Sequence, residues 1–411
     1  MKTWIQVLAG ILSGALLALL LPANSAILTI IDQLAIISLS IGRYIVLPLM
    51  FFSLIISVNQ LQRNKKLLKN TLLAIGLTFA FSLLLVIIGI ISSLLFSPGQ
   101  IPVVIDGIQS IEIPTFNDLV KLSFPNNIFN VFQNDFSRES NQFIPFFVFA
   151  IIIGFFMTKS SSEEVEPTFN LVDSLSRIFY KINEYFYKFS FIWITILTCS
   201  YITIINNIFD IQIFLPLTYM LLIITAVVIL VIYPVIFYYT CGKKNLFKYI
   251  LAEFSTLITA AITGDQFFTV SAIIPSHKKD FRVKRITSGF NIPFLTLFSK
   301  SGTALVSAIS FIVILKSYSS LEIQVAQILW VGYMSLFISF ILPTKGVGSS
   351  IASLFLLCSL YGHGGTMEDS FLILSPAFPI IAAISTVLNT ATIIMINLIL
   401  DPDKRALVER K

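Results

Sequence analysis

The stretch Tyr249–Pro275, YILAEFSTLITAAITGDQFFTVSAIIP, decides the fold, because basic residues flank it on both sides. Three lysines precede it and five basic residues follow it: Lys243, Lys244, Lys248, Lys278, Lys279, Arg282, Lys284 and Arg285. Clusters of Lys and Arg beside apolar segments stay on the cytoplasmic side of a membrane. Its centre, Thr263-Gly264-Asp265-Gln266, is a poor helix centre, and its 27 residues are too few for two spans of about 20 residues each. We therefore predict a re-entrant hairpin that enters and leaves on the cytoplasmic side.

The stretch Ile323–Tyr361 repeats this design around the polar centre Pro343-Thr344-Lys345-Gly346-Val347-Gly348-Ser349-Ser350. Neither end carries a basic cluster, so a hairpin here would enter from the outside. Two opposed hairpins, each followed by a long helix with a polar break, form an inverted repeat with a binding site near the bilayer midplane. Because this stretch has 39 residues, an ordinary pair of helices joined by a Gly-rich turn stays open as an alternative.

The composition indicates that the rest of the chain is also embedded in a lipid bilayer. Only 12% of the 411 residues are charged and 56% are hydrophobic, whereas a soluble protein has about 25% charged residues. Eight further apolar segments are predicted to span: Trp4–Leu21, Leu34–Val58, Leu72–Phe96, Phe143–Met157, Phe189–Ile205, Phe214–Tyr238, Ile286–Leu315 and Phe371–Leu400. The predicted fold class is therefore an all-α membrane protein with eight transmembrane helices plus two opposed re-entrant hairpins.

The distribution of charged residues predicts which loops face the cytoplasm and which face the outside. Further basic clusters at residues 63–69 and 404–411 are expected in the cytoplasm, and the acidic loop Ser97–Gln142 is expected outside. We expect a multi-pass protein of the inner membrane with both termini cytoplasmic. The formal charge of +6 then lies at the membrane surface and gives no indication of nucleic-acid binding.

Several motifs give the chain a resemblance to a known family. They include Phe96-Ser97-Pro98-Gly99, Phe124-Pro125-Asn126-Asn127, Ser301-Gly302-Thr303-Ala304-Leu305 and Ser385-Thr386-Val387-Leu388-Asn389. With the order hairpin, helix, hairpin, helix, they make nearly the whole chain similar to the dicarboxylate/amino acid:cation symporter family, which has the glutamate-transporter fold.

The resemblance implies a secondary transporter that moves by an elevator mechanism and assembles as a homotrimer in the lipid bilayer. It implies scaffold helices in residues 1–70, a transport-domain helix in 71–98, an outer loop and scaffold helices in 99–212, and the transport core in 213–411. The implied substrate is an amino acid or dicarboxylate, and the implied coupling cation is H⁺ or Na⁺.

The chain departs from the family where substrate and sodium are bound. The family aspartate that holds a substrate amino group falls on Ala382, the arginine that holds a carboxylate falls on Ser385, and the last acidic sodium ligand falls on Ile393. The cation-site positions of the third helix fall on Thr78, Phe81 and Ser82. Thr303, Thr386 and Asn389 are retained. The predicted substrate-binding residues are these three together with Asp265, Lys300, Lys345, Gly346, Ser349 and Ser385, and Ser299 and Ser301 are predicted to act in ion coupling.

Three ionisable residues are predicted at membrane depth: Asp265, Lys300 and Lys345. A buried charge must be paired or neutralised, so such residues indicate function. We hypothesise that Lys300 replaces a bound sodium ion, and that Asp265 is its counter-charge or holds a substrate ammonium. Lys345 is expected to bind substrate or to extend to the outer surface. Arg43 is expected to reach the membrane surface or to contact the scaffold.

The sequence thus predicts a symporter of amino acids or dicarboxylates, coupled to protons rather than sodium. The coupling residues would be Lys300, Asp265, Ser299 and Ser301. The alternative is a protein of the same descent that binds a ligand without transporting it. We expect no enzyme activity and no cofactor. We also expect no resident metal, since Cys199, Cys241 and Cys358 lack the spacing of metal ligands. His277 is expected to be solvated in the cytoplasmic loop.

Overall fold

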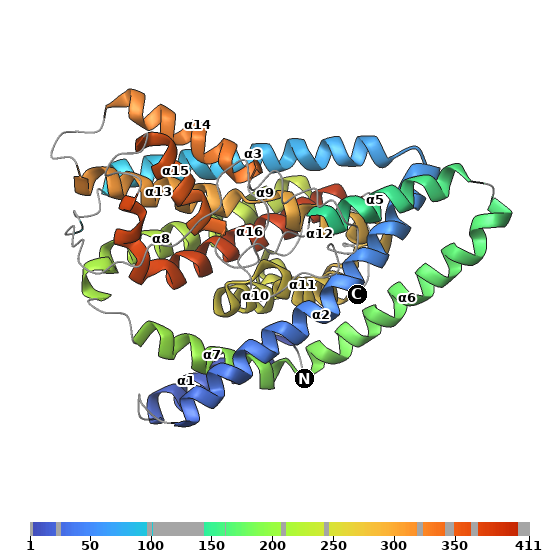
Figure 1. The fold of residues 1–411 in the computed structure, drawn as a ribbon, viewed down its shortest axis with the longest axis horizontal. Coiled ribbons are helices and arrows are strands. Elements are labelled where there is room, and N and C mark those ends of the chain that lie inside the picture. The colour runs from blue at the N-terminus through green and yellow to red at the C-terminus, as the bar shows by residue number, and fades with distance from the viewer. Residues whose placement is uncertain are drawn as a thin grey trace.

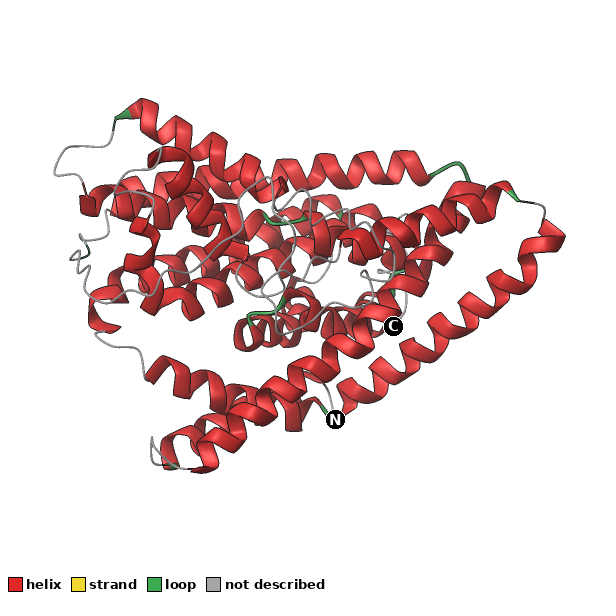
Figure 2. Cartoon of the chain, in the orientation of Figure 1, coloured by secondary structure: helices red, strands yellow, loops and turns green. Residues whose placement is uncertain are grey.

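The computed structural model describes residues 3–21, 26–96, 101, 144–160, 162–206, 211–241, 246–318, 324–341, 349–362 and 369–401. Within these ranges the chain is helical, with short connections and no strand (Figure 2). Its elements are α1 (Thr3–Leu20), α2 (Ala26–Arg63), α3 (Leu67–Phe96), α5 (Ile144–Lys159), α6 (Ser162–Lys188), α7 (Ser190–Asn206), α8 (Ile211–Val227), a π-helical turn η2 (Val228–Ile232), α9 (Tyr233–Thr240), α10 (Leu246–Thr263), α11 (Gln266–Ser276), a π-helical turn η3 (His277–Phe281), α12 (Arg285–Phe298), α13 (Ser301–Tyr318), α14 (Val325–Ile341), α15 (Ser349–Gly362), a 3₁₀ segment η4 (Asp369–Ala377) and α16 (Phe378–Leu400).

Apolar length marks which helices can cross a membrane. Among the described residues, five candidate spans are long and apolar enough: Ile27–Arg63, Leu67–Phe96, Gln212–Thr240, Arg285–Tyr318 and Ser370–Leu400. A sixth is possible if α6 and α7, which are bent by 63° at their junction, count as one span. The predicted spans Trp4–Leu21 and Phe143–Met157 are shorter apolar helices, α1 and α5. The all-helical membrane fold is confirmed at this level.

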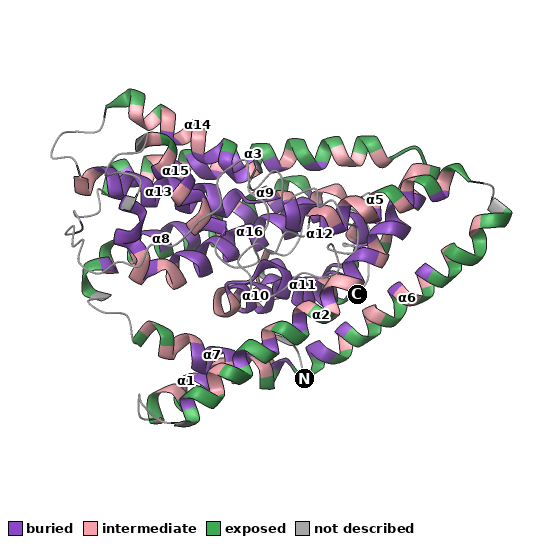
Figure 3. Ribbon diagram, viewed as in Figure 1, coloured by how far each residue is buried: buried purple, intermediate pink, exposed green. Residues whose placement is uncertain are grey.

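The core of the molecule is built from α12, α13 and α16. In the span Arg285–Tyr318, 94% of the most apolar window is buried, against 39% for α3. The helix α13 packs against α3, α14, α15 and α16, and α16 also packs against α10 and α12. Figure 3 shows these elements buried at the centre of the molecule, while one face of α6 and the outer faces of α1 and α3 are exposed.

A second group of helices lies along one side of this core. The long α2 packs against α5, α6 and α7, and α1 packs against α7 (Figure 1). The same α2 touches the core through α11 and α12. Close contact is possible there because Gly42 lies against the Phe268 ring and Gly289 lies against Ser57, where a Cβ would collide.

The outer surface carries the apolar side chains that lipid requires. Exposed large hydrophobic residues follow α3, α8–α9 and α14, and include Leu72, Phe79, Ile87, Leu95, Leu222, Ile223, Leu230, Leu329 and Phe337. Such a surface would aggregate in water, and it is the expected surface of a multi-pass membrane protein.

Two of the predicted irregularities occur where the sequence placed them. The helices α10 and α11 pack against each other and are joined by Gly264-Asp265. The long seventh segment is interrupted at Ser299-Lys300, between α12 and α13. The helices α14 and α15 also pack together, and residues 342–348 between them, which include Lys345 and Gly346, lie outside the described residues.

Candidate functional site

The turn between α10 and α11 is shaped by a glycine and an aspartate. Gly264 has a φ of +58°, a left-handed conformation that glycine adopts without steric cost. Asp265 is extended and caps α11, accepting hydrogen bonds from the amides of Phe267 at 2.8 Å and Phe268 at 3.4 Å. The carboxylate thereby satisfies amides that the first turn of a helix leaves unpaired. The turn that joins α10 and α11 is therefore stabilised by two of its own residues, Gly264 and Asp265.

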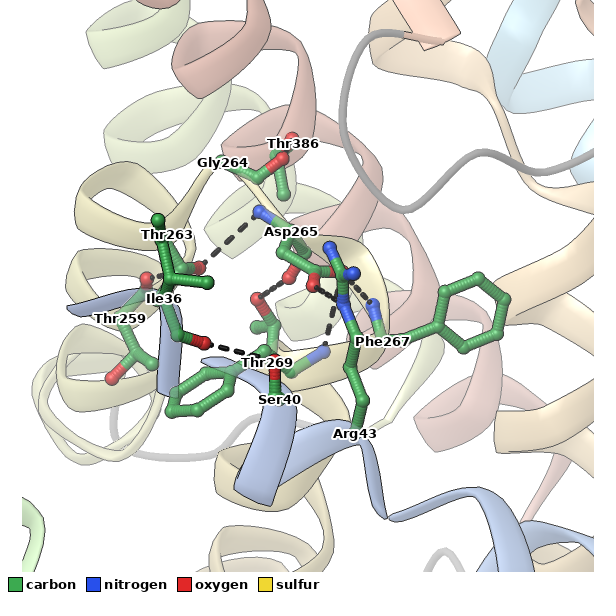
Figure 4. Close-up of polar contacts among 11 residues, drawn as sticks. Ile36, Ser40, Arg43, Thr259, Thr263, Gly264, Asp265, Phe267, Thr269 and Thr386 are labelled. Atoms are coloured by element: carbon green, nitrogen blue, oxygen red, sulfur yellow. Dashed lines mark hydrogen bonds and ion pairs between the residues drawn. The ribbon is translucent and has the colours of Figure 1, made fainter. Parts of the chain in front are cut away.

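Asp265 also binds a cation from a distant helix. Nε of Arg43, on α2, donates to Oδ2 of Asp265 at 2.5 Å (Figure 4). The Asp265 side chain is 0% exposed and that of Arg43 is 17% exposed. The described ion-pair partner of Asp265 in this conformation is therefore Arg43, and the hypothesis that Asp265 is the counter-charge of Lys300 or holds a substrate ammonium stays a prediction. The expectation that Arg43 reaches the membrane surface or contacts the scaffold stays a prediction, and its described partner is Asp265, the N-cap residue of α11.

Lys300 lies in the break between α12 and α13 and is fully buried, at 1% exposed. Its Nζ donates to Oε1 of Gln266 at 2.5 Å, and Nε2 of Gln266 donates to the Ser299 carbonyl at 3.5 Å. An ammonium has three donors, and the one described hydrogen bond goes to a neutral amide. Because Arg43 and Asp265 neutralise each other, a protonated Lys300 leaves this region with a net positive charge.

A network of short side chains joins α13 to α16. Oδ1 of Asn389 accepts from the amides of Gly302 at 2.8 Å and Thr303 at 3.2 Å, and its Nδ2 donates to Oγ1 of Thr303 at 3.0 Å. Asn389 thus caps α13 from a neighbouring helix. Gly302 makes this possible, because a Cβ there would lie 2.6 Å from the Ser385 carbonyl oxygen.

The same network reaches the other elements of the site. Oγ1 of Thr386 donates to the Gly264 carbonyl at 3.0 Å, which ties α16 to the tip of the first helix pair. Oγ1 of Thr303 lies 3.0 Å from Oγ of Ser349 on α15. The hydroxyl of Ser301 lies 2.8 Å from that of Ser82 on α3. Five elements therefore meet in one buried polar region: α3, α11, α13, α15 and α16.

A family model now identifies the chain. The model of the sodium:dicarboxylate symporter family matches residues 3–402, almost the entire length. The chain belongs to the sodium:dicarboxylate symporter family. No individual curated protein shows a significant match.

Family membership makes the protein a multi-pass membrane transporter of the sodium:dicarboxylate symporter type. The resemblance drawn from the motifs is confirmed. Within the structure, the described residues predicted for the site are all buried: Asp265, Ser299, Lys300, Ser301, Thr303, Ser349, Ser385, Thr386 and Asn389. Their roles in binding or coupling stay predictions.

Sequence reasoning missed the surroundings of three buried polar residues. Gln266 is the partner of Lys300, although its place beside Asp265 was visible in the sequence. Glu253 is a second buried carboxylate in the hairpin stretch, 1% exposed on α10, and its position in an apolar segment was the available signal. His277 is not solvated as expected: it is 1% exposed, and its Nδ1 lies 2.6 Å from Nδ2 of Asn397 on α16.

Proposed function

We propose that this symporter-family transporter carries small carboxylate-bearing solutes, amino acids or dicarboxylates, coupled to protons rather than sodium. The observation that carries the proposal is the buried Lys300, whose described hydrogen bond is to a neutral amide. A substrate carboxylate in this region would pair with the ammonium and satisfy its remaining donors.

The positive charge argues against a sodium ion nearby. Two unit charges 4 Å apart repel by about 4 kcal/mol at an effective dielectric of 20, which is roughly three powers of ten in affinity. The family's carboxylate sodium ligand is replaced by Ile393, and hydroxyls such as Ser82 and Ser301 bond to each other. Hard cations bind best where several oxygens, carboxylates prominent among them, are supplied.

Proton coupling follows from the cost of an unpaired buried charge. The substrate carboxylate and the ammonium of Lys300 would cross the membrane as a neutral pair. After the substrate leaves, an isolated ammonium would cost several kcal/mol in the protein interior, so the lysine would release its proton and return neutral. Each cycle then carries a proton in the direction of the substrate.

We further propose the arrangement that the family resemblance implies. The group α1, α2, α5, α6 and α7 would be the scaffold of a homotrimer in the inner membrane, with both chain termini in the cytoplasm. The core of α3 and α8–α16, including two re-entrant hairpins, would move as an elevator. Because the ion pair of Arg43 and Asp265 joins the two groups, it would have to break when the core moves.

The test is an uptake assay in proteoliposomes with the Na⁺ and pH gradients varied separately. The panel contains L-aspartate, L-glutamate, succinate and a neutral amino acid. We expect an inward proton gradient to drive uptake at equal Na⁺ on both sides, and Lys300→Met to abolish it. Lys159→Met, on an exposed lysine at the end of α5, is the matched control and should transport normally.

Two results would overturn the proton proposal: steep dependence on a Na⁺ gradient at constant pH, or full uptake by Lys300→Met. Saturable binding of a panel solute without any uptake would instead support the alternative, a family-derived binding or scaffold protein.

A further inference from the structure

A cavity of about 550 Å³ lies between α2 and α6 on one side and α11, η3 and α12 on the other. It is outside the polar region described above. Its apolar wall is made by Leu49, Met50, Ile274, Val283, Ile292 and Pro293. This volume falls within the range of about 300–1,000 Å³ that is typical of ligand-binding pockets.

Four cationic side chains line the same cavity: Arg177 and Lys181 from α6, Lys278 from η3 and Arg285 from α12. The described residues that line it include no aspartate or glutamate. All four cations are exposed, with the side chain of Arg177 at 68%, that of Lys278 at 57% and that of Arg285 at 38%. The cationic groups are therefore accessible to a ligand.

Neighbouring carboxylates neutralise only part of this charge. Arg177 and Arg285 share the single carboxylate of Asp173, at 2.7 and 3.1 Å. Glu184 is shared between Lys278 and Lys279, at 3.8 and 3.6 Å, distances that are long for a strong ion pair. With Asp280, which interacts with Lys279, three carboxylates stand against five cations. The cavity therefore keeps a net positive charge.

The start of α12 adds to the attraction for an anion. The helix begins at Arg285 on the cavity wall, and its N-cap residue Lys284 provides no side-chain hydrogen bond to the first turn. First-turn amides have no partner within their own helix and favour negative charge, phosphate in particular.

We propose that this cavity binds one anionic phospholipid, with its phosphate at the four cations and its acyl chains along the apolar wall of α2 and α12. The combination of apolar depth and cationic rim favours a lipid over a free anion. The cytoplasmic leaflet is rich in anionic lipid, and basic pockets between membrane helices on that side bind such headgroups. The inference rests on the cytoplasmic placement of the basic residues 278–285, which the sequence predicts from their charge.

The location gives the lipid a structural effect. The cations come from α6 in one group of helices and from η3 and α12 in the core, so a phosphate between them would join the two groups. A bound lipid would therefore stabilise the arrangement of the helices seen in this structure.

The experiment measures lipid binding to the purified protein by native mass spectrometry and by thermal unfolding in detergent. The probes are phosphatidylglycerol, phosphatidylcholine, the soluble headgroup glycerophosphoglycerol, inorganic phosphate and succinate. We expect phosphatidylglycerol alone to bind tightly and to raise the unfolding temperature. The double variant Lys181→Gln, Lys278→Gln should bind it about 10- to 30-fold more weakly, since each basic residue contributes about a factor of five.

The matched control is Lys66→Gln, Lys69→Gln, which removes the same charge from exposed lysines away from the cavity. It should bind phosphatidylglycerol within twofold of the unchanged protein. Equal loss in both double variants, or equal stabilisation by phosphatidylcholine, would overturn the proposal. Stabilisation by phosphate, the headgroup or succinate to the same extent would also overturn it. Because binding is read without transport, these outcomes are independent of the uptake assay.

Discussion

At the scale of single residues, the ion pair between Arg43 and Asp265 is the contact whose loss we expect to affect stability, because its carboxylate is fully buried. Arg43→Gln would leave a fully buried carboxylate without its cation, a change that costs about 3–5 kcal/mol in a closed interior and less here, because Arg43 is 17% exposed. Asp265→Asn should cost less, since the arginine can turn toward solvent and an asparagine still caps α11. Asp265→Ala should cost about 1 kcal/mol more than Asp265→Asn, because the cap is lost.

These values are measured as free energies of unfolding in mixed micelles. The double variant Arg43→Gln, Asp265→Asn should recover much of the stability that Arg43→Gln loses, since no unpaired charge remains. Lys69→Gln, on an exposed lysine of α3 that does not line the lipid cavity, is the control and should change stability by about 0.5 kcal/mol or less. If the two single costs simply add in the double variant, the ion pair does not form as described.

At the scale of elements, the contact between α13 and α16 depends on Gly302. A Cβ at this position would lie 2.6 Å from the Ser385 carbonyl oxygen and 2.8 Å from the Asn389 amide nitrogen, both backbone atoms of α16. The helices would have to separate, and the cap that Asn389 provides to α13 would weaken. We expect Gly302→Ala to destabilise the protein by about 1–3 kcal/mol, the usual cost of overpacking.

Gly76 on α3 offers a matched control for that substitution, because it is helical and exposed and nothing lies within 4 Å of a Cβ built on it. Gly76→Ala should be neutral or stabilise by up to about 1 kcal/mol, from helix propensity alone. Thermal unfolding of the two variants side by side provides the measurement. Equal behaviour of the two alanines would refute the close packing of α13 on α16.

At the scale of the whole molecule, the test concerns the side of the membrane on which α10 and α11 begin and end. Single cysteines are introduced as Lys244→Cys and Lys279→Cys after replacing the three native cysteines, which are buried. We expect a membrane-impermeant maleimide to label both only after the membrane is opened, because basic residues flank both ends of the stretch. Glu112→Cys, in the acidic loop, should be labelled in intact cells.

Labelling of Lys244→Cys and Lys279→Cys from opposite sides would show that α10 and α11 together cross the membrane. The re-entrant arrangement would then be wrong, and so would the placement of the basic loop beside the lipid cavity. This outcome is separate from the uptake assay, which measures transport whatever the topology.

The sequence by itself determined the class of protein and the places where its helices break. Hydrophobic length and the placement of Lys and Arg are local properties of the chain, so they can be read without knowing what packs against what. The interruption at Ser299-Lys300 and the tip at Gly264-Asp265 follow from residues that suit a helix interior poorly. The motifs around Thr303 and Asn389 were sufficient for the family, as the match over residues 3–402 shows.

Only the tertiary structure decided the partners of the buried polar groups. Asp265 pairs with Arg43, 222 residues away, and Lys300 pairs with Gln266 rather than with the adjacent carboxylate. Asn389 caps a helix 86 residues before it, and His277 is enclosed against α16. Each pairing depends on how two packed helices are rotated about their axes and shifted along them. Hydrophobic periodicity leaves both quantities undetermined, because a helix that is apolar on every side can be buried in any rotation.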